Sequence, residues 1–405
     1  MTKIQKDNKN VAKFPNLRFP EFTEEWEERK LGEIGDVKMC KRIFNDETTT
    51  VGEIPFFKIG SFGKEADAFI SQDLYTDYKT RFPFPKKGDI LISAAGTIGR
   101  TVVYDGNDAY FQDSNIVWID NDNKNITNEF LYYILQIVKY NTEGGTIQRL
   151  YNNILKSTKF SSPSIQEQEK ISSFLSLLDE RIQTQNKIIE ELKLLKITIS
   201  KKLFSRQLRF KNENNENYID WNTKKLGEVT TLVNKRNKNN EKLPVYSINN
   251  KLGFVPQSEQ FEGVDSEDRG YDIKLYKIID KNTFAYNPAR INVGSIGYSE
   301  NLENIIISSL YVCFKTDNTV NDNFLYQYLK TDFFNREVLR NVEGGVRDYL
   351  FYDNFARIKF GLPCIEEQKK IADYLSSIDS KIDIESQLLH KFEKQKRYLL
   401  ANLFI

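Results

Sequence analysis

The stretch that decides the fold runs from Pro163 to Ile182, PSIQEQEKISSFLSLLDERI, because it returns at Pro363 to Ile382 as PCIEEQKKIADYLSSIDSKI. The interval is 200 residues, about half of a chain of 405 residues. Other segments of the first half also return in the second: WEERKLGEI at Trp26 as WNTKKLGEV at Trp221, GTIG at Gly96 as GSIG at Gly294, FLYYIL at Phe130 as FLYQYL at Phe324, and EGG at Glu143 and Glu343. A repeat that spans the chain predicts two similar structural units.

Each repeated stretch begins a long helix with a regular apolar stripe. The stripe advances in alternating steps of four and three residues through Ile171, Leu175, Leu178, Ile182, Ile189 and Leu192, and in the second copy through Ile371, Leu375, Ile378, Ile382, Leu389 and Phe392. A period of 3.5 residues over about five heptads is typical of a coiled-coil seam. Polar residues fill gaps in both stripes, and we expect them to fix the register: Gln185, Lys196, Glu385 and Lys396.

Two helices of this kind in one chain each need a partner for their seam, and the simplest solution is that they pair with each other. Parallel and antiparallel pairing would both bury the seam. We expect antiparallel pairing, which relates the two units by an approximate two-fold axis and sends them to opposite ends of the helix pair. Each helix would be about 58 Å long at 1.5 Å per residue.

The rest of each half indicates mixed helix and strand. Strand-like runs such as DILIS (89–93) and NIVWI (115–119) lie among turn clusters. One amphipathic helix follows in each unit, NEFLYYILQIVKY in the first and NDNFLYQYLKTDFF in the second. The predicted fold class is therefore α+β: two similar mixed α/β domains separated by two long helices that form an antiparallel intramolecular coiled coil with pseudo-two-fold symmetry.

Composition narrows the class of protein further. The net charge of +1 excludes a uniformly basic nucleic-acid binder but allows a locally basic one. The sequence has no run of 18 or more apolar residues and no apolar region typical of a secretory signal near its start, so we expect a cytoplasmic protein. The three cysteines, Cys40, Cys313 and Cys364, lack metal-ligand spacing, which suits a reducing compartment.

Motifs for catalysis are missing. The single histidine, His390, lies within the second long helix, and the sequence contains no phosphate-binding loop. NPAR (287–290) lacks the second proline and the aromatic residue of the Asn-Pro-Pro-aromatic motif of amino-methyltransferases, so we interpret it as a turn. The acidic residues that begin the long helices are explained by the helix macrodipole. A binding or assembly protein, without a metal site, is the stronger hypothesis.

Basic and polar residues occur at similar positions of both halves, in loops of their variable interiors. Arginine, asparagine and glutamine make bidentate contacts with base edges in the major groove, and lysine or arginine neutralises phosphates. For any one of these residues a solvated surface position is the simpler explanation; their pairing across two units favours DNA. The candidate DNA-binding residues are Lys41, Arg42, Thr97, Arg100, Gln148, Arg149, Lys235, Arg236, Arg290, Asn292 and Arg347.

Taken together, these motifs resemble the specificity (S) subunit of type I restriction-modification systems. The resemblance covers nearly the whole chain and depends on LRFPEFTEEWEERKLGEI, on GDILIS followed by GTIG, and above all on the doubled start of the long helices. It implies target recognition domains at 1–160 (core about 26–160) and 206–360 (core about 221–360), and conserved helices at 161–205 and 361–405, spanning Ile165 to Leu203 and Ile365 to Leu403.

The resemblance also implies partners. Double-stranded DNA would be read as a split target, one half by each domain, while the helices space the halves and dock two methyltransferase subunits. Those subunits bind S-adenosylmethionine and methylate adenine at N6, and restriction subunits that use ATP and Mg²⁺ join the larger complex. This chain itself would bind no cofactor and catalyse nothing. Two alternatives stay open: a coiled-coil scaffold that assembles partners without touching DNA, and a degenerate single-chain methyltransferase-nuclease.

Overall fold

The computed structural model describes residues 14–140, 149–260, 272–342 and 349–405. The chain forms two compact units, of which unit 2 is one continuous stretch of sequence and unit 1 combines two separate stretches. Unit 1 contains residues 1–186 together with 388–405, and unit 2 contains residues 187–387. Each long helix therefore contributes one part to each unit. The domain boundaries drawn from the sequence instead treat each long helix as a separate segment.

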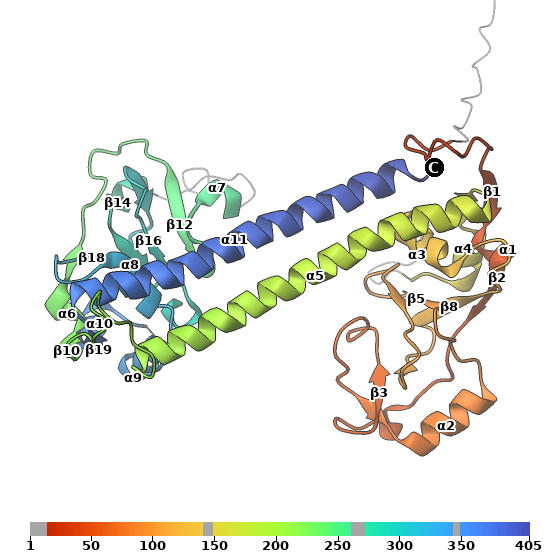
Figure 1. Cartoon of the computed structure of the whole chain (residues 1–405), viewed down its shortest axis with the longest axis horizontal. Coiled ribbons are helices and arrows are strands. Elements are labelled where there is room, and N and C mark those ends of the chain that lie inside the picture. Colours follow the sequence, from red (N-terminus) through yellow and green to blue (C-terminus); the bar gives the residue numbers. More distant parts are fainter. Residues whose placement is uncertain (1–13, 141–148, 261–271, 343–348) are drawn as a thin grey trace, which may run out of the picture. The chain divides into compact units, whose positions relative to one another are not determined.

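Unit 1 is built on a four-stranded sheet with the order β2-β8-β5-β6, in which all neighbouring strands are antiparallel. Its strands are Gly35–Lys38, Ile116–Asn121, Ile90–Ser93 and Thr101–Val103. A smaller sheet, β4-β3-β7, contains Phe69–Ile70, Ile54–Phe57 and Tyr110–Phe111, and β1 (Glu27–Lys30) pairs with β9 (Lys159–Ser162). The helices are α1 (Leu31–Ile34), α2 (Gln72–Arg81), α3 (Asn128–Ile137) and α4 (Asn152–Ser157), with a 3₁₀ turn at Asn45–Glu47. Figure 1 shows β5 and β8 side by side, with α2 and β3 in the part of the unit formed by the smaller sheet.

Unit 2 repeats this plan. Its two four-stranded sheets have the orders β11-β18-β15-β16 and β13-β12-β17-β14, and β10 (Asn222–Lys225) pairs with β19 (Lys359–Leu362). The strands of the first sheet are Thr230–Val233, Val312–Thr316, Phe284–Tyr286 and Ile296–Tyr298, and those of the second are Gly253–Pro256, Val245–Asn249, Ile305–Ile307 and Lys277–Ile279. The helices are α6 (Leu226–Val229), α7 (Gln257–Gln260), α8 (Asp322–Tyr328), α9 (Asp332–Asn341) and α10 (Tyr352–Arg357), with 3₁₀ turns at Ile273–Leu275 and Ile291–Val293.

The prediction of one amphipathic helix over NDNFLYQYLKTDFF is wrong, because the structure has two separate helices there, α8 and α9. α8 ends at Tyr328, and Thr331 begins α9 by accepting a hydrogen bond from the backbone N–H of Phe334 at its hydroxyl. A threonine that caps a new helix competes with continuation of the preceding one. In unit 1 the corresponding helix, α3, is continuous over Asn128–Ile137.

The two long helices are α5 (Ile165–Phe204) and α11 (Ile365–Asn402). In unit 1 the early part of α5 packs with the end of α11, and Lys396 lies 2.6 Å from Asp179. In unit 2 the end of α5 packs with the early part of α11, and Lys196 lies 2.6 Å from Asp379. Late residues of one helix pair with early residues of the other in both units, as antiparallel pairing requires.

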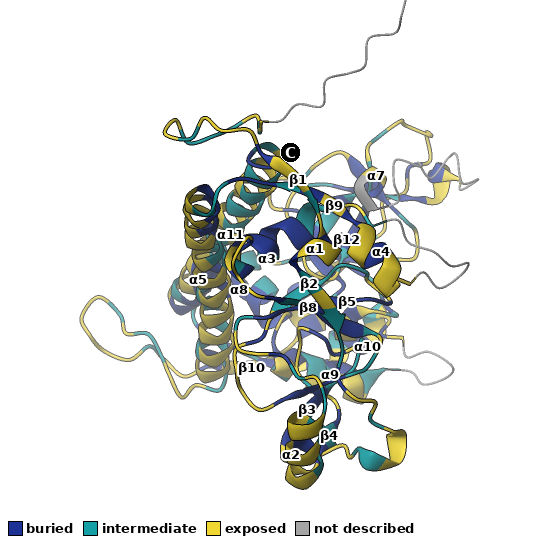
Figure 2. Ribbon diagram, turned by 90° about the vertical axis from the view of Figure 1, so that its right-hand side faces the viewer, coloured by how far each residue is buried: buried dark blue, intermediate teal, exposed yellow. Residues whose placement is uncertain are grey.

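Every predicted seam residue of these helices is buried or half-buried. Ile171, Leu175, Leu178 and Ile189 of α5 and Ile371, Leu375 and Ile378 of α11 are buried. Ile182, Leu192, Ile382, Leu389 and Phe392 are half-buried. Exposed residues follow the outward face of α5 (Figure 2). Of the four polar residues expected to fix the register, Lys196 and Lys396 form the two ion pairs across the seam.

A backbone hydrogen bond connects the start of unit 1 with the end of α11, and an equivalent bond in unit 2 connects the segment after α5 with the end of α5. The backbone N–H of Leu17 donates to the carbonyl of Asn402 at 2.8 Å, and that of Leu208 donates to the carbonyl of Lys202 at 3.1 Å. Leu403 and Phe404 lie in the core of unit 1 with Trp26, just as Leu203 lies in the core of unit 2 with Trp221. Unit 1 is therefore assembled from two distant segments of the chain that reproduce a continuous segment of unit 2.

Candidate nucleic-acid interface

In unit 1 the loop between β5 and β6 gathers three of the predicted DNA-binding residues. Ser93 organises this loop: its hydroxyl donates to the carbonyl of Thr97 and accepts from the N–H of Arg100 at 2.9 Å. Gly96 and Gly99 adopt positive φ values of 64° and 80°, which only glycine adopts freely, so the GTIG motif makes a tight turn. The turn leaves Thr97 exposed at its tip.

Arg100 and Arg149 lie on either side of this turn. The guanidinium of Arg100 donates to the carbonyl of Phe62 at 2.9 Å, which ties the loop to the segment after β3. Arg149 forms an antiparallel bridge with Ala95, next to the turn, and its side chain is exposed. A cavity of about 290 Å³ opens between the loop and the segment after β3, lined by Ile59, Gly60, Lys64, Ser93, Gly96, Thr97 and Arg100.

Unit 2 places Arg290 and Asn292 in the equivalent loop, between β15 and β16. Both side chains are exposed, and the loop closes through the carbonyl of Arg290, which accepts from the N–H groups of Val293 and Ser295 at 3.2 and 3.1 Å. Gly294 has a φ of 87°. The backbone of Leu350 donates to the carbonyl of Pro288 at 3.1 Å, as Leu150 donates to Ala94 at 2.9 Å in unit 1. The two units therefore present the same loop-and-strand site, here called the reading site: residues 94–100 with 149–151 in unit 1, and residues 287–295 with 349–351 in unit 2.

Four other predicted residues do not join the reading sites and have contacts of their own. Arg42 forms an ion pair with Asp113 at 2.9 Å, and the ammonium of Lys41 lies 5.2 Å from the ring centre of Phe82. Lys235 lies 3.5 Å from Asp280, and Arg236 forms a backbone bridge with Lys277. Gln148 and Arg347 lie outside the described residues.

The sequence interpretation missed a pair of buried ion pairs that attach each unit to its long helix. Arg18 contacts Glu167 at 2.7 Å in unit 1, and Arg209 contacts Glu367 at 2.8 Å in unit 2. Both glutamates are buried, and the hydrogen bonds that the guanidinium groups donate to these carboxylates raise the pKa of both arginines. The macrodipole explanation for these acids is therefore incomplete. The signal was present, because LRF occurs at 17–19 and again at 208–210.

The glutamine that follows each of these glutamates fixes the first turn of its helix. The side chain of Gln168 donates to the carbonyls of Pro163 and Asn125 at 3.0 and 2.9 Å, and its oxygen accepts from the N–H of Thr127 at 3.0 Å. Gln368 makes the same three kinds of bond, to Pro363, Thr319 and Asn321. The proline, glutamate and glutamine repeated at the start of the two long helices (163, 167 and 168, and again 363, 367 and 368) thus orient each helix on its unit.

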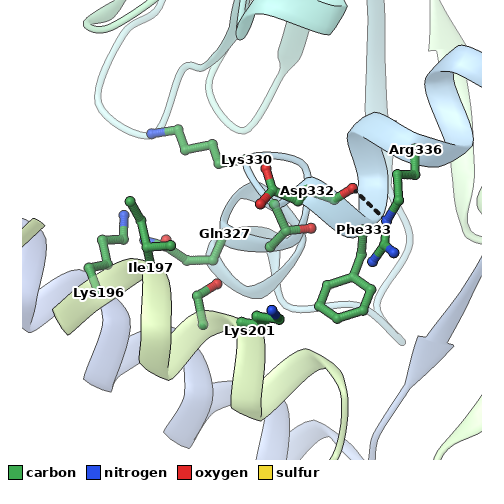
Figure 3. Close-up of a pocket in the computed structure, with 10 residues that line it drawn as sticks. Lys196, Ile197, Lys201, Gln327, Lys330, Asp332, Phe333 and Arg336 are labelled. Carbon is green, nitrogen blue, oxygen red and sulfur yellow. Dashed lines mark hydrogen bonds between the residues drawn. The ribbon is translucent and has the colours of Figure 1, made fainter. Parts of the chain in front are cut away.

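Unit 2 also contains a basic pocket. It has a volume of about 420 Å³ and is lined by Lys196, Ile197, Ser200, Lys201, Gln327, Lys330, Thr331, Asp332, Phe333 and Arg336 (Figure 3). Lys196 is bonded to Asp379 at its base, and Arg336 donates to the backbone carbonyl of Asp332. Lys330 lies 3.8 Å from the ring centre of Tyr326. Residues 187–211 carry eight lysines and arginines against two glutamates, and part of this basic stretch therefore lines the pocket.

Two negative results concern only the residues that the structure describes. None of their helices combines the length and apolarity that crossing a membrane requires. Within the same residues, no group of three or more histidine, cysteine, aspartate or glutamate side chains has an arrangement that would hold a metal ion.

Comparison with known proteins identifies the family. The model of the type I restriction modification DNA specificity domain matches residues 23–194 and again residues 218–394. These two matches span most of the chain and coincide with the two repeats. The chain belongs to this family, and it is a type I restriction-modification specificity subunit.

Individual relatives agree with this assignment. A protein of Haemophilus influenzae described as a type I restriction enzyme specificity subunit is 54% identical over 166 residues, which is 41% of this chain and 42% of that protein, less than half of its length. The specificity subunit of the MjaVIII type I restriction enzyme of Methanocaldococcus jannaschii is 29% identical over 71% of this chain and 72% of its own. The crystal structure of a type I restriction-modification S subunit from M. genitalium has the same fold, with a TM-score of 0.61 at 19% identity, over 97% of this chain and 99% of that one.

Proposed function

We propose that this chain recognises a bipartite DNA sequence for a type I restriction-modification complex, with one half-site read by each unit. The observation that carries the proposal is the repetition of the reading site. Both units hold a rigid hairpin loop against an extended strand, but the exposed side chains differ: Thr97 and Arg149 in unit 1, Arg290 and Asn292 in unit 2. A conserved frame with different donors and acceptors suits two different half-sites.

The two long helices would set the distance between the half-sites. Support comes from their continuity and from the ion pairs Lys196–Asp379 and Lys396–Asp179, which oppose sliding of one helix along the other. Units held at opposite ends of this pair would read half-sites about one helical turn apart, roughly 10 base pairs centre to centre, on one face of the duplex.

Catalysis would come from partner subunits. Two methyltransferase subunits would bind S-adenosylmethionine and methylate adenine at N6, and restriction subunits would use ATP and Mg²⁺. This chain would bind none of these cofactors. Docking on the long helices is supported by large apolar side chains that are exposed on them, Leu177, Leu194 and Ile197 on α5 and Ile384 on α11, all more than half exposed.

Mapping of N6-methyladenine in DNA from cells that carry the complete system tests the proposal. The expected result is methylation at a two-part sequence with a fixed spacer, lost when the gene for this chain is deleted. Binding of that duplex by the chain with its methyltransferase should weaken steeply with salt. Methylation that persists without this chain, or a target without a spacer, would contradict the proposal. Assembly of partners without duplex binding would favour the scaffold alternative.

A matched insertion tests the distance-setting role. Because the seam alternates steps of three and four, four residues added after Asn186 in α5 and after Gln387 in α11 would add one step to both helices. The insertion lengthens each helix by about 6 Å, close to two base pairs. Methylation should move to sites with a longer spacer and unchanged half-sites. An insertion in α5 alone is the control, and it should impair assembly. An unchanged spacer after the matched insertion would exclude the role.

A further inference from the structure

Each reading site ends in an extended tripeptide, residues 149–151 in unit 1 and 349–351 in unit 2. The middle residue, Leu150 or Leu350, is buried and its N–H is bonded to the neighbouring hairpin. Alternation along an extended backbone then turns the residues on either side of the leucine toward solvent. These outer positions are therefore held rigidly, next to the loop, with their side chains free to contact a ligand.

The outer positions carry side chains with a flat group in both units. In unit 2 the rings of Tyr349 and Phe351 are 37% and 49% exposed, their centroids are 5.6 Å apart, and their planes are within 4° of parallel. In unit 1 the equivalent residues are Arg149, which is exposed, and Tyr151, which is 47% exposed. A guanidinium plane and an aromatic ring are both flat groups on which a nucleobase stacks.

The surroundings favour a nucleic acid over an apolar protein surface. Beside the two rings of unit 2 lies the loop with the exposed Arg290 and Asn292. Beside the arginine and the single ring of unit 1 lies the loop with Thr97. Exposed rings bordered by cationic and amide side chains combine base stacking with groups that bond phosphates and base edges. The arrangement is repeated at equivalent positions of two units whose loops otherwise differ.

We propose that Tyr349 and Phe351 in unit 2, and Arg149 and Tyr151 in unit 1, contact the faces of nucleobases in the target duplex. The inference rests on the proposed DNA-reading function and assigns these residues a role different from phosphate neutralisation. A base face is accessible only where a step of the duplex is opened, so the contact includes local unstacking.

The test uses the full chain in complex with its methyltransferase, and the duplex found by methyladenine mapping as the probe. The variant Tyr349→Ser/Phe351→Ser should bind the duplex about 5- to 150-fold more weakly, the loss expected for one stacked base. Because no cation is removed, the slope of log affinity against log salt should stay unchanged. The matched variant Arg290→Gln should reduce that slope by about one. The conservative variant Tyr349→Phe/Phe351→Tyr should bind like the wild type.

Photo-cross-linking supplies an independent readout. Duplexes with 5-iodouracil placed at successive positions of the unit 2 half-site should cross-link to Tyr349 or Phe351 at one position, and the serine variant should lose that product. Wild-type affinity in the serine variant, or a weaker affinity that comes with a smaller salt slope, would overturn the inference. Loss of methyltransferase from the serine complex would assign the rings to a protein contact and overturn it too. A wild-type complex that binds no duplex would instead overturn the proposed function.

Discussion

At the scale of single residues, the two units are most alike where each is attached to its long helix. Glu167 and Glu367 are both buried and both paired with an arginine that comes from a distant segment. A buried carboxylate needs such a partner, because an unpaired charge in the interior costs several kcal/mol. Glu367 also accepts a hydrogen bond from the indole N–H of Trp221, at 3.0 Å. The equivalent indole N–H of Trp26 has no acceptor among the described residues.

This difference predicts unequal effects of one substitution. Trp221→Phe and Trp26→Phe remove similar volumes from equivalent core positions, but only the first removes a hydrogen bond to a carboxylate. We expect Trp221→Phe to lower the free energy of unfolding by about 1 to 2 kcal/mol more than Trp26→Phe. Urea denaturation of both variants measures this difference in the free energy of unfolding. Equal losses would mean that the indole bond to Glu367 contributes nothing to stability.

The cysteines give a prediction on pH. Burial raises the pKa of Cys40 and of Cys313 to about 12, whereas Cys364 is only half-buried. In the native chain at pH 8, iodoacetamide should modify Cys364 and leave the other two until denaturant is added. Because the unfolded thiols ionise first, near pH 9, the two buried thiols should also make unfolding easier as the pH rises from 9 toward 12. Rapid native labelling of Cys40 or Cys313, read by mass spectrometry, would contradict the structure.

Sequence reasoning succeeded for contacts between residues close in sequence and was weaker for distant ones. The seam residues were found because a heptad pattern is local. The roles of Arg18 and Arg209 were not found, because their partners lie 149 and 158 residues away. The candidate DNA-binding residues remain predictions: the structure brings Thr97, Arg100 and Arg149 together, and Arg290 with Asn292, but places Lys41, Arg42, Lys235 and Arg236 in other contacts.

At the scale of elements, two polar positions of the seam form ion pairs between the long helices. Lys196 is bonded to both oxygens of Asp379, and Gln327 of α8 donates to the same carboxylate at 2.9 Å. In unit 1 the equivalent carboxylate, Asp179, accepts from the hydroxyl of Tyr133 at 2.9 Å. Each ion pair therefore links both long helices with a short helix of its unit. The sequence predicted the lysines but not their partners, because a seam pattern specifies which positions face inward and not what they meet.

A double-mutant cycle measures this link. Lys196→Met and Asp379→Asn should each destabilise unit 2, and the double variant should lose less than the sum of the two, with a coupling energy of about 1 kcal/mol. The estimate is modest because the two side chains are 19% and 36% exposed and thus partly screened by solvent. Thermal and urea denaturation supply the four values. Strict additivity would show that the pair adds no stability.

The same cycle in unit 1, with Lys396→Met and Asp179→Asn, is the matched control. Those side chains are 18% and 20% exposed, so their coupling should be at least as large. A coupling in one unit only would mean that the two ends of the helix pair are aligned by different means.

At the scale of the whole molecule, the contact between Leu17 and Asn402 in unit 1 is equivalent to the contact between Leu208 and Lys202 in unit 2. This equivalence predicts that the order of the segments along the chain can be changed. Five residues separate Lys202 from Leu208 in unit 2, and the fourth of them, Arg206, has a φ of 63°. Joining Ile405 to Asn16 through one glycine would place five residues between Asn402 and Leu17, with glycine at the position of positive φ.

A circular permutant with this join, and with new ends in the exposed turn between Asn212 and Asn217, should fold. We expect its circular dichroism spectrum and its urea midpoint to be close to those of the parent chain, and its target methylation to be unchanged. The control has the same new ends but lacks the join, so that its two pieces are separate. A permutant that fails to fold would show that the contact between Leu17 and Asn402 is not equivalent to that between Leu208 and Lys202.

The distant origin of the two parts of unit 1 also affects the order of events during protein synthesis. Trp26 is made early, but its core partners Leu403 and Phe404 leave the ribosome about 380 residues later, which at cellular elongation rates is a delay of roughly 20 to 75 s. Unit 2 has no such gap, since all of its residues lie between 187 and 387. During translation the nascent first half must therefore wait, with part of its apolar interior uncovered. A chaperone or a co-translationally bound partner would have its greatest effect in that interval.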